Sequence, residues 1–246
     1  MLTGIGLVLL AGVAAGLRES LPPERRTPRG FSTAIHTMGL LAHDGRFMGY
    51  TFTSALTTAM FFGYLSTSSF VLQGIYGVSP TAFSLLFALN AVGMLLAAQL
   101  NGFLLARFSP RALLGAALML LLATGVTLVA VALIGGLGIV AVAVPFFVLV
   151  AAMGITSPNV TALALSLHPE VAGSASASFG TLRLALGAAA TPLATIGGEV
   201  SELSMALLMA GTAAGAVAVF AATVRKERVA VPVSATAEAE GELPVA

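Results

Sequence analysis

The residues most able to do chemistry in this chain are polar side chains set within long apolar stretches, and Arg183 is the most unusual of them. It lies in the middle of the apolar run 171–197. If that run crosses a membrane, a charge at its centre costs roughly 3 kcal/mol and needs water, an anion or hydrogen-bonding partners. Snorkelling of the long side chain is the competing explanation, but neither interface is near at this depth. We therefore predict that Arg183 faces a cavity.

Hydroxyl side chains are concentrated in the apolar stretch that follows Arg46. Tyr50, Ser54 and Thr58 recur at every fourth position, with Thr51 beside them, so they share one face of a helix. One interpretation is the wall of a water-lined cavity that holds substrate. The other is helix packing, because Ser and Thr allow close approach and bond to their own backbone. The spacing is compatible with both.

Carboxamides lie within two further apolar stretches. Asn90 is near the middle of one, where an amide needs a partner or water. Asn159 follows Pro158 in the other, which also contains Pro145. Because proline removes an internal hydrogen bond, we expect a kink at each proline, and we predict Asn90 and Asn159 as cavity residues. The alternatives are a buried interhelical hydrogen bond for Asn90 and a permanent kink without a ligand at Pro158.

Other kinds of chemistry lack the residues they need. The long apolar stretches contain neither Asp nor Glu, so no carboxylate inside them can carry protons. The histidines, His36, His43 and His168, fall between these stretches, and the chain has no cysteine. The sequence shows no nucleophile–base pair, phosphate-binding loop or metal-ligand cluster. We therefore predict no enzyme activity, no metal or cofactor site and no nucleic-acid partner.

The composition places these polar residues in a membrane. Of the 246 residues, 58% are hydrophobic and 9% are charged, with a mean hydropathy of +1.01. Soluble domains contain about 25% charged residues, so this chain could not cover a soluble surface. The apolar stretches lack alternation, which favours helices over barrel strands. The predicted fold class is an all-α membrane protein.

About seven transmembrane helices are predicted. Between Arg46 and Arg107 the chain has no charged residue, a length that suits two helices at about 20 residues each. The turn between them falls before Ser79, which can cap a helix that begins at Pro80. The predicted spans are 1–17, 47–72, 82–106, 112–134, 138–165, 171–197 and 203–224. The run 1–17 is short for a span, which predicts a transmembrane helix clipped at its start, with a cleaved signal as the alternative.

Two segments differ from these spans. Residues 18–46 hold five arginines and a Pro22-Pro23 break, and we predict a cytoplasmic linker with a surface helix over 31–41. Residues 225–246 begin with a basic cluster and then lose all periodicity, which predicts a disordered cytoplasmic tail. Residues 47–224 form the predicted six-helix transmembrane bundle.

Basic residues set the predicted orientation. Ten of the eleven Lys and Arg residues lie in alternate connections: five in 18–46, two at Arg107 and Arg111, and three in 225–228. Because basic loops stay cytoplasmic, we predict a cytoplasmic C-terminus and an external Met1. Arg107 and Arg111 would then gate or anchor the cytoplasmic rim. An external start with an odd number of helices is expected for the distal part of a longer protein.

Small residues recur at the start of the span 171–197. Ala172, Ser176 and Gly180 are each separated by four positions, with Gly173 and Ala177 beside them. Small residues at this spacing let helix backbones approach closely. We predict a tight packing seam along this face.

Seven short motifs occur in order along the chain. They are Ser69-Phe-Val-Leu-Gln73, Tyr76-Gly-Val-Ser79, Phe87-Ala-Leu-Asn-Ala91, Gln99-Leu-Asn101, Arg107-Phe-Ser-Pro-Arg111, Pro158-Asn-Val-Thr-Ala-Leu-Ala-Leu165 and Ala172-Gly-Ser-Ala-Ser-Ala177. This ordered set resembles the Bcr/CflA drug-resistance branch of the major facilitator superfamily, over about residues 1–224. By that resemblance the spans correspond to the last helix of the N-terminal bundle and the six-helix C-terminal bundle of a twelve-helix transporter.

The resemblance implies drug:proton antiport across the bacterial inner membrane, by two bundles that rock around a central site. Its expected partners are small drug-like substrates, the lipid bilayer and an N-terminal helical bundle missing from this sequence. Relatives place their proton-coupling carboxylate in the missing helices, and they commonly have an uncharged polar residue where Arg183 stands. The alternative function is a non-transporting membrane scaffold or an inactive truncated transporter fragment.

Overall fold

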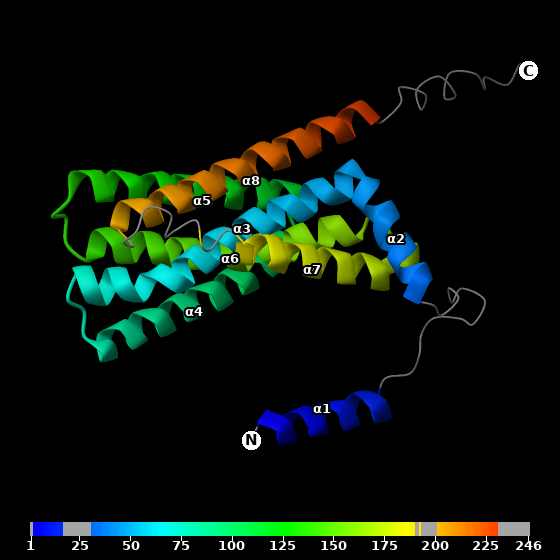
Figure 1. Cartoon of the computed structure of the whole chain (residues 1–246), viewed down its shortest axis with the longest axis horizontal. Helices are drawn as coiled ribbons and strands as arrows, with labels where there is room; N and C mark the ends of the chain where they lie inside the picture. The colour runs from blue at the N-terminus through cyan, green and yellow to red at the C-terminus, as the bar shows by residue number, and fades with distance from the viewer. Residues whose placement is uncertain (1, 17–30, 190–191, 193–200, 231–246) are drawn as a thin grey trace, which may run out of the picture. The chain divides into compact units, whose positions relative to one another are not determined.

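The computed structural model describes residues 2–16, 31–189, 192 and 201–230 (Figure 1). All regular secondary structure in these ranges is helical, which confirms the predicted all-α membrane fold. The chain divides after His36 into two compact units. In the first unit, α1 (Leu2–Gly16) is an apolar helix whose large side chains are exposed. The helix α2 (Phe31–His43) extends across the boundary and contains the predicted surface helix.

The second unit is a bundle of long helices joined by short connections (Figure 1). Its elements are α3 (Gly45–Ser69), continued by the π-helical turn η2 (Phe70–Ile75), α4 (Pro80–Leu104), α5 (Pro110–Ile134), α6 (Val140–Leu165), the 3₁₀ turn η3 (Pro169–Val171), α7 (Ala172–Ala189) and α8 (Glu202–Ala230). Within the described residues, five helices are long and apolar enough to cross a membrane: α3 with η2, α4, α5, α6, and α8 as far as Thr223.

The other two predicted spans are shorter in the structure. The helix α1 has 15 residues, and α7 has 18 residues that include Arg183 and several serines. The prediction extends the α7 span to Gly197, and this end lies outside the described residues. The linker 18–30 and the tail 231–246 also lie outside them.

The basic cluster after the last span is helical, contrary to the prediction. The sequence predicts that the span ends at Val224 and that disorder begins at Arg225, but α8 continues to Ala230. Lys, Arg and Glu are good helix formers, so they can extend an apolar helix beyond its membrane-spanning part. The change from apolar to charged residues marks the end of the span and not the end of the helix.

Two serine–proline pairs start α4 and α5 as the sequence predicts. The Ser79 hydroxyl accepts a hydrogen bond from the Ala82 N–H at 3.3 Å, and the Ser109 hydroxyl accepts one from the Ala112 N–H at 3.2 Å. A proline follows each serine at the first helical position, where its missing N–H costs nothing. These caps fix where α4 and α5 begin.

The helix α3 lies at the centre of the bundle. It packs against α6, α7 and α8, while α5 packs against α6 and α8, and α4 against α6. Two glycines mark close approaches. A Cβ atom on Gly125 of α5 would lie 2.8 Å from the Cα atom of Ala210 in α8. A Cβ atom on Gly154 of α6 would meet the carbonyl oxygen of Met94 in α4.

The predicted packing seam on α7 is not buried within the described residues. Ala172, Gly173, Ser176 and Ala177 are exposed, and a Cβ atom on Gly173 or Gly180 would meet nothing within 4 Å. The buried residues of α7 lie on another face, at Ala175, Ser178, Phe179 and Gly187. Small residues at four-residue spacing show that one face of a helix can pack closely. When another face of the same helix also carries small residues, the spacing does not say which face is buried.

Hydrogen bonds between connections agree with the predicted alternation of sides. At one end of the bundle, the His168 Nε2 atom lies 2.8 Å from Asp44 Oδ2. At the start of α8, Glu202 Oε1 accepts a hydrogen bond from Tyr76 Oη at 2.8 Å. Burial and the neighbouring carboxylate raise the pKa of Tyr76 to about 12, so the phenol remains a donor. Each pair joins two connections that the charge pattern assigns to the same side.

Single cysteines test this orientation, since the chain has no other thiol. Ala106 and Leu137 are exposed in successive connections. We expect Ala106→Cys to react with a membrane-impermeant maleimide only after the cells are permeabilised, because its connection carries Arg107 and Arg111. We expect Leu137→Cys to react in intact cells. The reverse labelling pattern would overturn the predicted cytoplasmic C-terminus.

Asp44 links the start of α3 to the stability of the bundle at low pH. Burial raises its pKa, but hydrogen bonds from the Arg46 N–H, His168 and the Phe47 N–H outweigh burial, so the pKa of Asp44 lies below its ordinary value. A carboxyl whose pKa is lower in the folded state stabilises that state above its unfolded pKa. This stabilisation is lost as the pH falls through the folded pKa.

Asp44→Ala is therefore expected to lower the free energy of unfolding by about 1 kcal/mol at pH 7. The difference from the parent chain should shrink below about pH 4, where the unfolded carboxyl protonates. Asp44→Asn is the control, because it keeps an acceptor for the N-terminal N–H groups. Thermal melts at pH 7 and pH 3 measure the effect, and an equal loss at both values would contradict this account.

Candidate functional site

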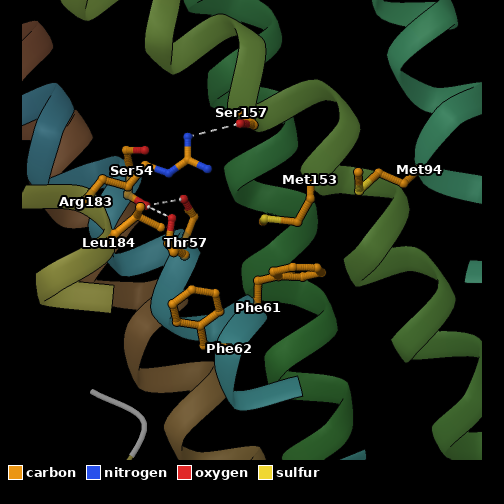
Figure 2. Close-up of a pocket in the computed structure, with 10 residues that line it drawn as sticks. Ser54, Thr57, Phe61, Phe62, Met94, Met153, Ser157, Arg183 and Leu184 are labelled. Atoms are coloured by element: carbon orange, nitrogen blue, oxygen red, sulfur yellow. Dashed lines mark hydrogen bonds between the residues drawn. The ribbon is translucent and has the colours of Figure 1, made fainter. Parts of the chain in front are cut away.

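A cavity of about 160 Å³ lies where α3, α4, α6 and α7 meet (Figure 2). Its lining combines hydroxyl, aromatic, thioether and guanidinium groups. The lining residues are Ser54, Thr57, Thr58, Phe61, Phe62, Met94, Met153, Ser157, Arg183 and Leu184. Three of the residues predicted from the sequence as cavity residues, Ser54, Thr58 and Arg183, are therefore brought together from two helices.

The α3 wall of the cavity presents hydrogen-bond acceptors. The hydroxyls of Thr57 and Thr58 donate to the Ser54 carbonyl oxygen at 3.0 and 2.7 Å. A hydroxyl that donates to its own helix still has lone pairs with which to accept. These hydroxyls therefore bond to their own backbone and also line the cavity. A role in holding substrate remains a prediction.

Arg183 adds a guanidinium from α7 to the lining. Its Nη1 atom lies 3.4 Å from Ser157 Oγ, a long hydrogen bond that Figure 2 shows reaching from α7 to α6. The Nε atom of Arg183 is buried and has no partner among the described residues. The spans of α3 to α7 contain no Asp or Glu, so no carboxylate within them neutralises this charge.

Tyr50 and Asn90 do not line this cavity, although the sequence predicts them there. Tyr50 is buried, with its ring centroid 6.4 Å from that of Phe220 in α8. Asn90 is buried in α4, and its Nδ2 atom donates to Tyr64 Oη in α3 at 2.9 Å. This contact is the interhelical hydrogen bond that the sequence left open as the alternative.

Asn159 also lies away from the cavity. Its Nδ2 atom donates to Asn101 Oδ1 of α4 at 2.6 Å and to the Ile155 carbonyl oxygen at 2.7 Å. Ser157, two residues earlier in α6, does line the cavity. Two positions along an α-helix differ by about 200° around its axis, so Ser157 and Asn159 point to different neighbours.

The two prolines of α6 do not interrupt the helix. Pro145 and Pro158 both lie inside Val140–Leu165, which is continuous. The structure therefore shows no broken helix with an unwound segment at the cavity. Each proline still removes one backbone donor from α6, and the predicted kinks remain predictions.

Arg107 and Arg111 lie in the α4–α5 connection and the first turn of α5. Arg107 is exposed and Arg111 is half-buried, and neither lines the cavity. They lie between two spans, in one of the basic connections from which the cytoplasmic side was predicted. The gating role remains a prediction.

Sequence reasoning did not select several lining residues. Thr57 is one helical turn from the predicted residue Ser54, and Phe61 is one turn from Thr58, so helical spacing could have identified these two positions. The aromatic and thioether groups gave no separate signal. In a membrane helix, Phe and Met facing a cavity have the same sequence pattern as Phe and Met facing lipid or a neighbouring helix.

Comparisons with known proteins agree with this architecture. A family model described as Major Facilitator Superfamily matches residues 1–192. The chain is 37% identical over 231 residues to an uncharacterized MFS-type transporter, YdgK, of Bacillus subtilis (strain 168), a match that covers 92% of this chain and 55% of the relative. It is 30% identical over 185 residues to a bicyclomycin resistance protein homolog of Haemophilus influenzae, covering 75% of this chain and 46% of the relative. The chain thus spans about half the length of the curated relatives it matches.

Proposed function

Because this chain belongs to the major facilitator superfamily, a family of transporters and not of enzymes, we propose that it forms part of a proton-coupled multidrug efflux transporter. The relative named for bicyclomycin resistance suggests small drug-like substrates. The observation that carries the proposal is the cavity with its hydroxyls and guanidinium, lined by residues of four helices. Polar groups at this depth are costly unless they serve a pathway or a bound molecule.

In this proposal, α3 to α8 act as one bundle of an alternating-access transporter in the bacterial inner membrane. The cavity forms one wall of the substrate site, and a second helical bundle, which the described residues do not include, completes it. Since the spans of α3 to α7 carry no carboxylate, the proton-coupling acid would lie in that second bundle. Arg107 and Arg111 would contact the cytoplasmic surface, with the C-terminus on the same side.

A chimera tests the proposal. The N-terminal part of the Haemophilus influenzae relative, up to the start of its match, is fused to this 246-residue chain and expressed in a drug-sensitive bacterium. We expect the chimera to raise the tolerated concentration of bicyclomycin above that of the N-terminal part alone, and a protonophore to abolish the difference. The 246-residue chain alone is expected to give no drug-dependent proton flux in vesicles, because alternating access requires two bundles.

Each part of the proposal has its own contradicting result. Tolerance that survives the protonophore would contradict proton coupling. A chimera present in the membrane at normal levels without raised tolerance would contradict the transport function. Transport by the chain alone would contradict the requirement for a second bundle.

A further inference from the structure

We propose that the cavity between α3, α4, α6 and α7 binds a single aromatic ring that carries an anionic group, with the anion at Arg183. This inference rests on the proposed function, since it names the substrate class of the same site. It is carried by three properties of the lining: a guanidinium with no carboxylate partner among the described residues, a volume suited to one ring, and aromatic and thioether side chains in the same cavity.

The guanidinium gives the cavity its preference for anions. Arg183 contributes five N–H donors, yet among the described residues it makes only the 3.4 Å bond to Ser157, and its buried Nε is unpaired. An arginine with free donors forms short, charge-assisted bonds to a carboxylate or sulfonate. In a low-dielectric site the same charge repels cationic ligands, because Coulomb energies are larger there than in water.

The size of the cavity limits the part of the ligand that this chain surrounds. An apolar cavity of about 150 Å³ accepts benzene. The cavity here is about 160 Å³, so it accommodates one ring with a small substituent. A fused or polycyclic ligand would have to extend beyond it.

The remaining lining suits an aromatic ring. Phe61, Phe62, Met94 and Met153 line the same cavity as Arg183. Aromatic rings pack favourably on other rings and on thioether sulfur. On the α3 wall, the Thr57 and Thr58 hydroxyls have lone pairs available and can accept from a donor on the ring. Anion and ring are thus recognised by different parts of one cavity.

Three probes that share a ring and differ in charge test the inference: 4-fluorobenzoate, 4-fluorobenzamide and 4-fluorobenzylammonium. The full chain is placed in lipid nanodiscs, and binding is measured from ¹⁹F line broadening, with empty nanodiscs as the blank. We expect the benzoate to bind at least about tenfold more tightly than the ammonium probe, as a hydrogen-bonded charge provides. Arg183→Gln should remove this preference, and Arg183→Lys should retain it.

Two further variants keep the test decisive. Arg107→Gln removes an exposed arginine away from the cavity and should leave all three affinities unchanged. Thr57→Phe fills the cavity while keeping Arg183, and it should abolish binding of all three probes even if Arg183→Gln fails to fold. Equal binding of the three probes, an anion preference that survives Arg183→Gln in a folded chain, or undiminished binding by Thr57→Phe would overturn the inference.

The outcome can be separated from that of the proposed function. A chimera that exports drug, in a chain that binds the three probes equally, would remove this inference and leave the transport function. If the chain prefers the anionic probe but its chimera does not transport, the proposed function is contradicted and this inference stands.

Discussion

Gly154→Ala is expected to lower the melting temperature of the chain. A methyl group at Gly154 would meet the Met94 carbonyl oxygen and lie 3.0 Å from the Ala98 nitrogen. Both atoms belong to the backbone of α4, so the contact cannot be relieved by rotating a side chain. Overpacking of this kind costs about 1–3 kcal/mol. The opposing gain from replacing glycine by alanine in a helix is at most about 1 kcal/mol.

Gly102→Ala is the matched control for this prediction. Gly102 lies in α4, and a Cβ atom there would meet nothing within 4 Å. This substitution keeps the gain in helix preference without the clash, so it should leave the melting temperature unchanged or raise it. Circular dichroism melts in one detergent compare the two variants. A Gly154→Ala chain as stable as Gly102→Ala would show that α4 and α6 do not approach as the structure describes.

Replacing one asparagine of the Asn101–Asn159 pair is expected to destabilise the chain more than replacing both. Asn101 and Asn159 are 4% and 2% exposed, and the bond between their side chains is 2.6 Å long. Asn159→Leu leaves the Asn101 amide buried without that donor, at a cost of about 1–3 kcal/mol. The double variant Asn101→Leu and Asn159→Leu removes both polar groups and should recover most of the loss.

A double-mutant cycle on thermal stability measures this coupling. Gln99→Leu is the control. Gln99 is an exposed amide in α4, the helix that carries Asn101, so its replacement should change thermal stability little. If the double variant loses the sum of the two single losses, the amides act independently and the contact does not join α4 to α6.

The limits of the helices were largely predictable because they depend on local chemistry. The predicted spans 82–106, 112–134 and 138–165 agree with α4, α5 and α6 to within two residues at each end. Ser79 and Ser109, each followed by proline, determine where α4 and α5 begin, and both signals lie within a few residues of the helix start. The end of α8 was missed because a membrane-spanning length does not limit a helix that continues outside the membrane.

The cavity was predictable only in part, because packing is not a local property. Arg183 was identified because the energetic cost of a charge depends on its depth, which can be read from one helix. Asn90 and Asn159 were misplaced because an amide can be satisfied by any adjacent helix, and the sequence does not say which helix is adjacent. Tyr64 and Asn101 are those partners, and each lies on another helix.

The π-helical turn η2, at the end of α3, affects how the chain can vary over evolution. A π turn accommodates one residue more than an α-helical turn. Elsewhere in a helix, gaining or losing one residue rotates everything beyond it by about 100°, which would turn buried side chains outward. Deleting a residue from Phe70–Ile75 would instead restore α-helical geometry. Single-residue deletions among descendants of this sequence are therefore expected to be tolerated at this turn, beyond Ser54 and Thr58, where they leave the wall of the cavity in register.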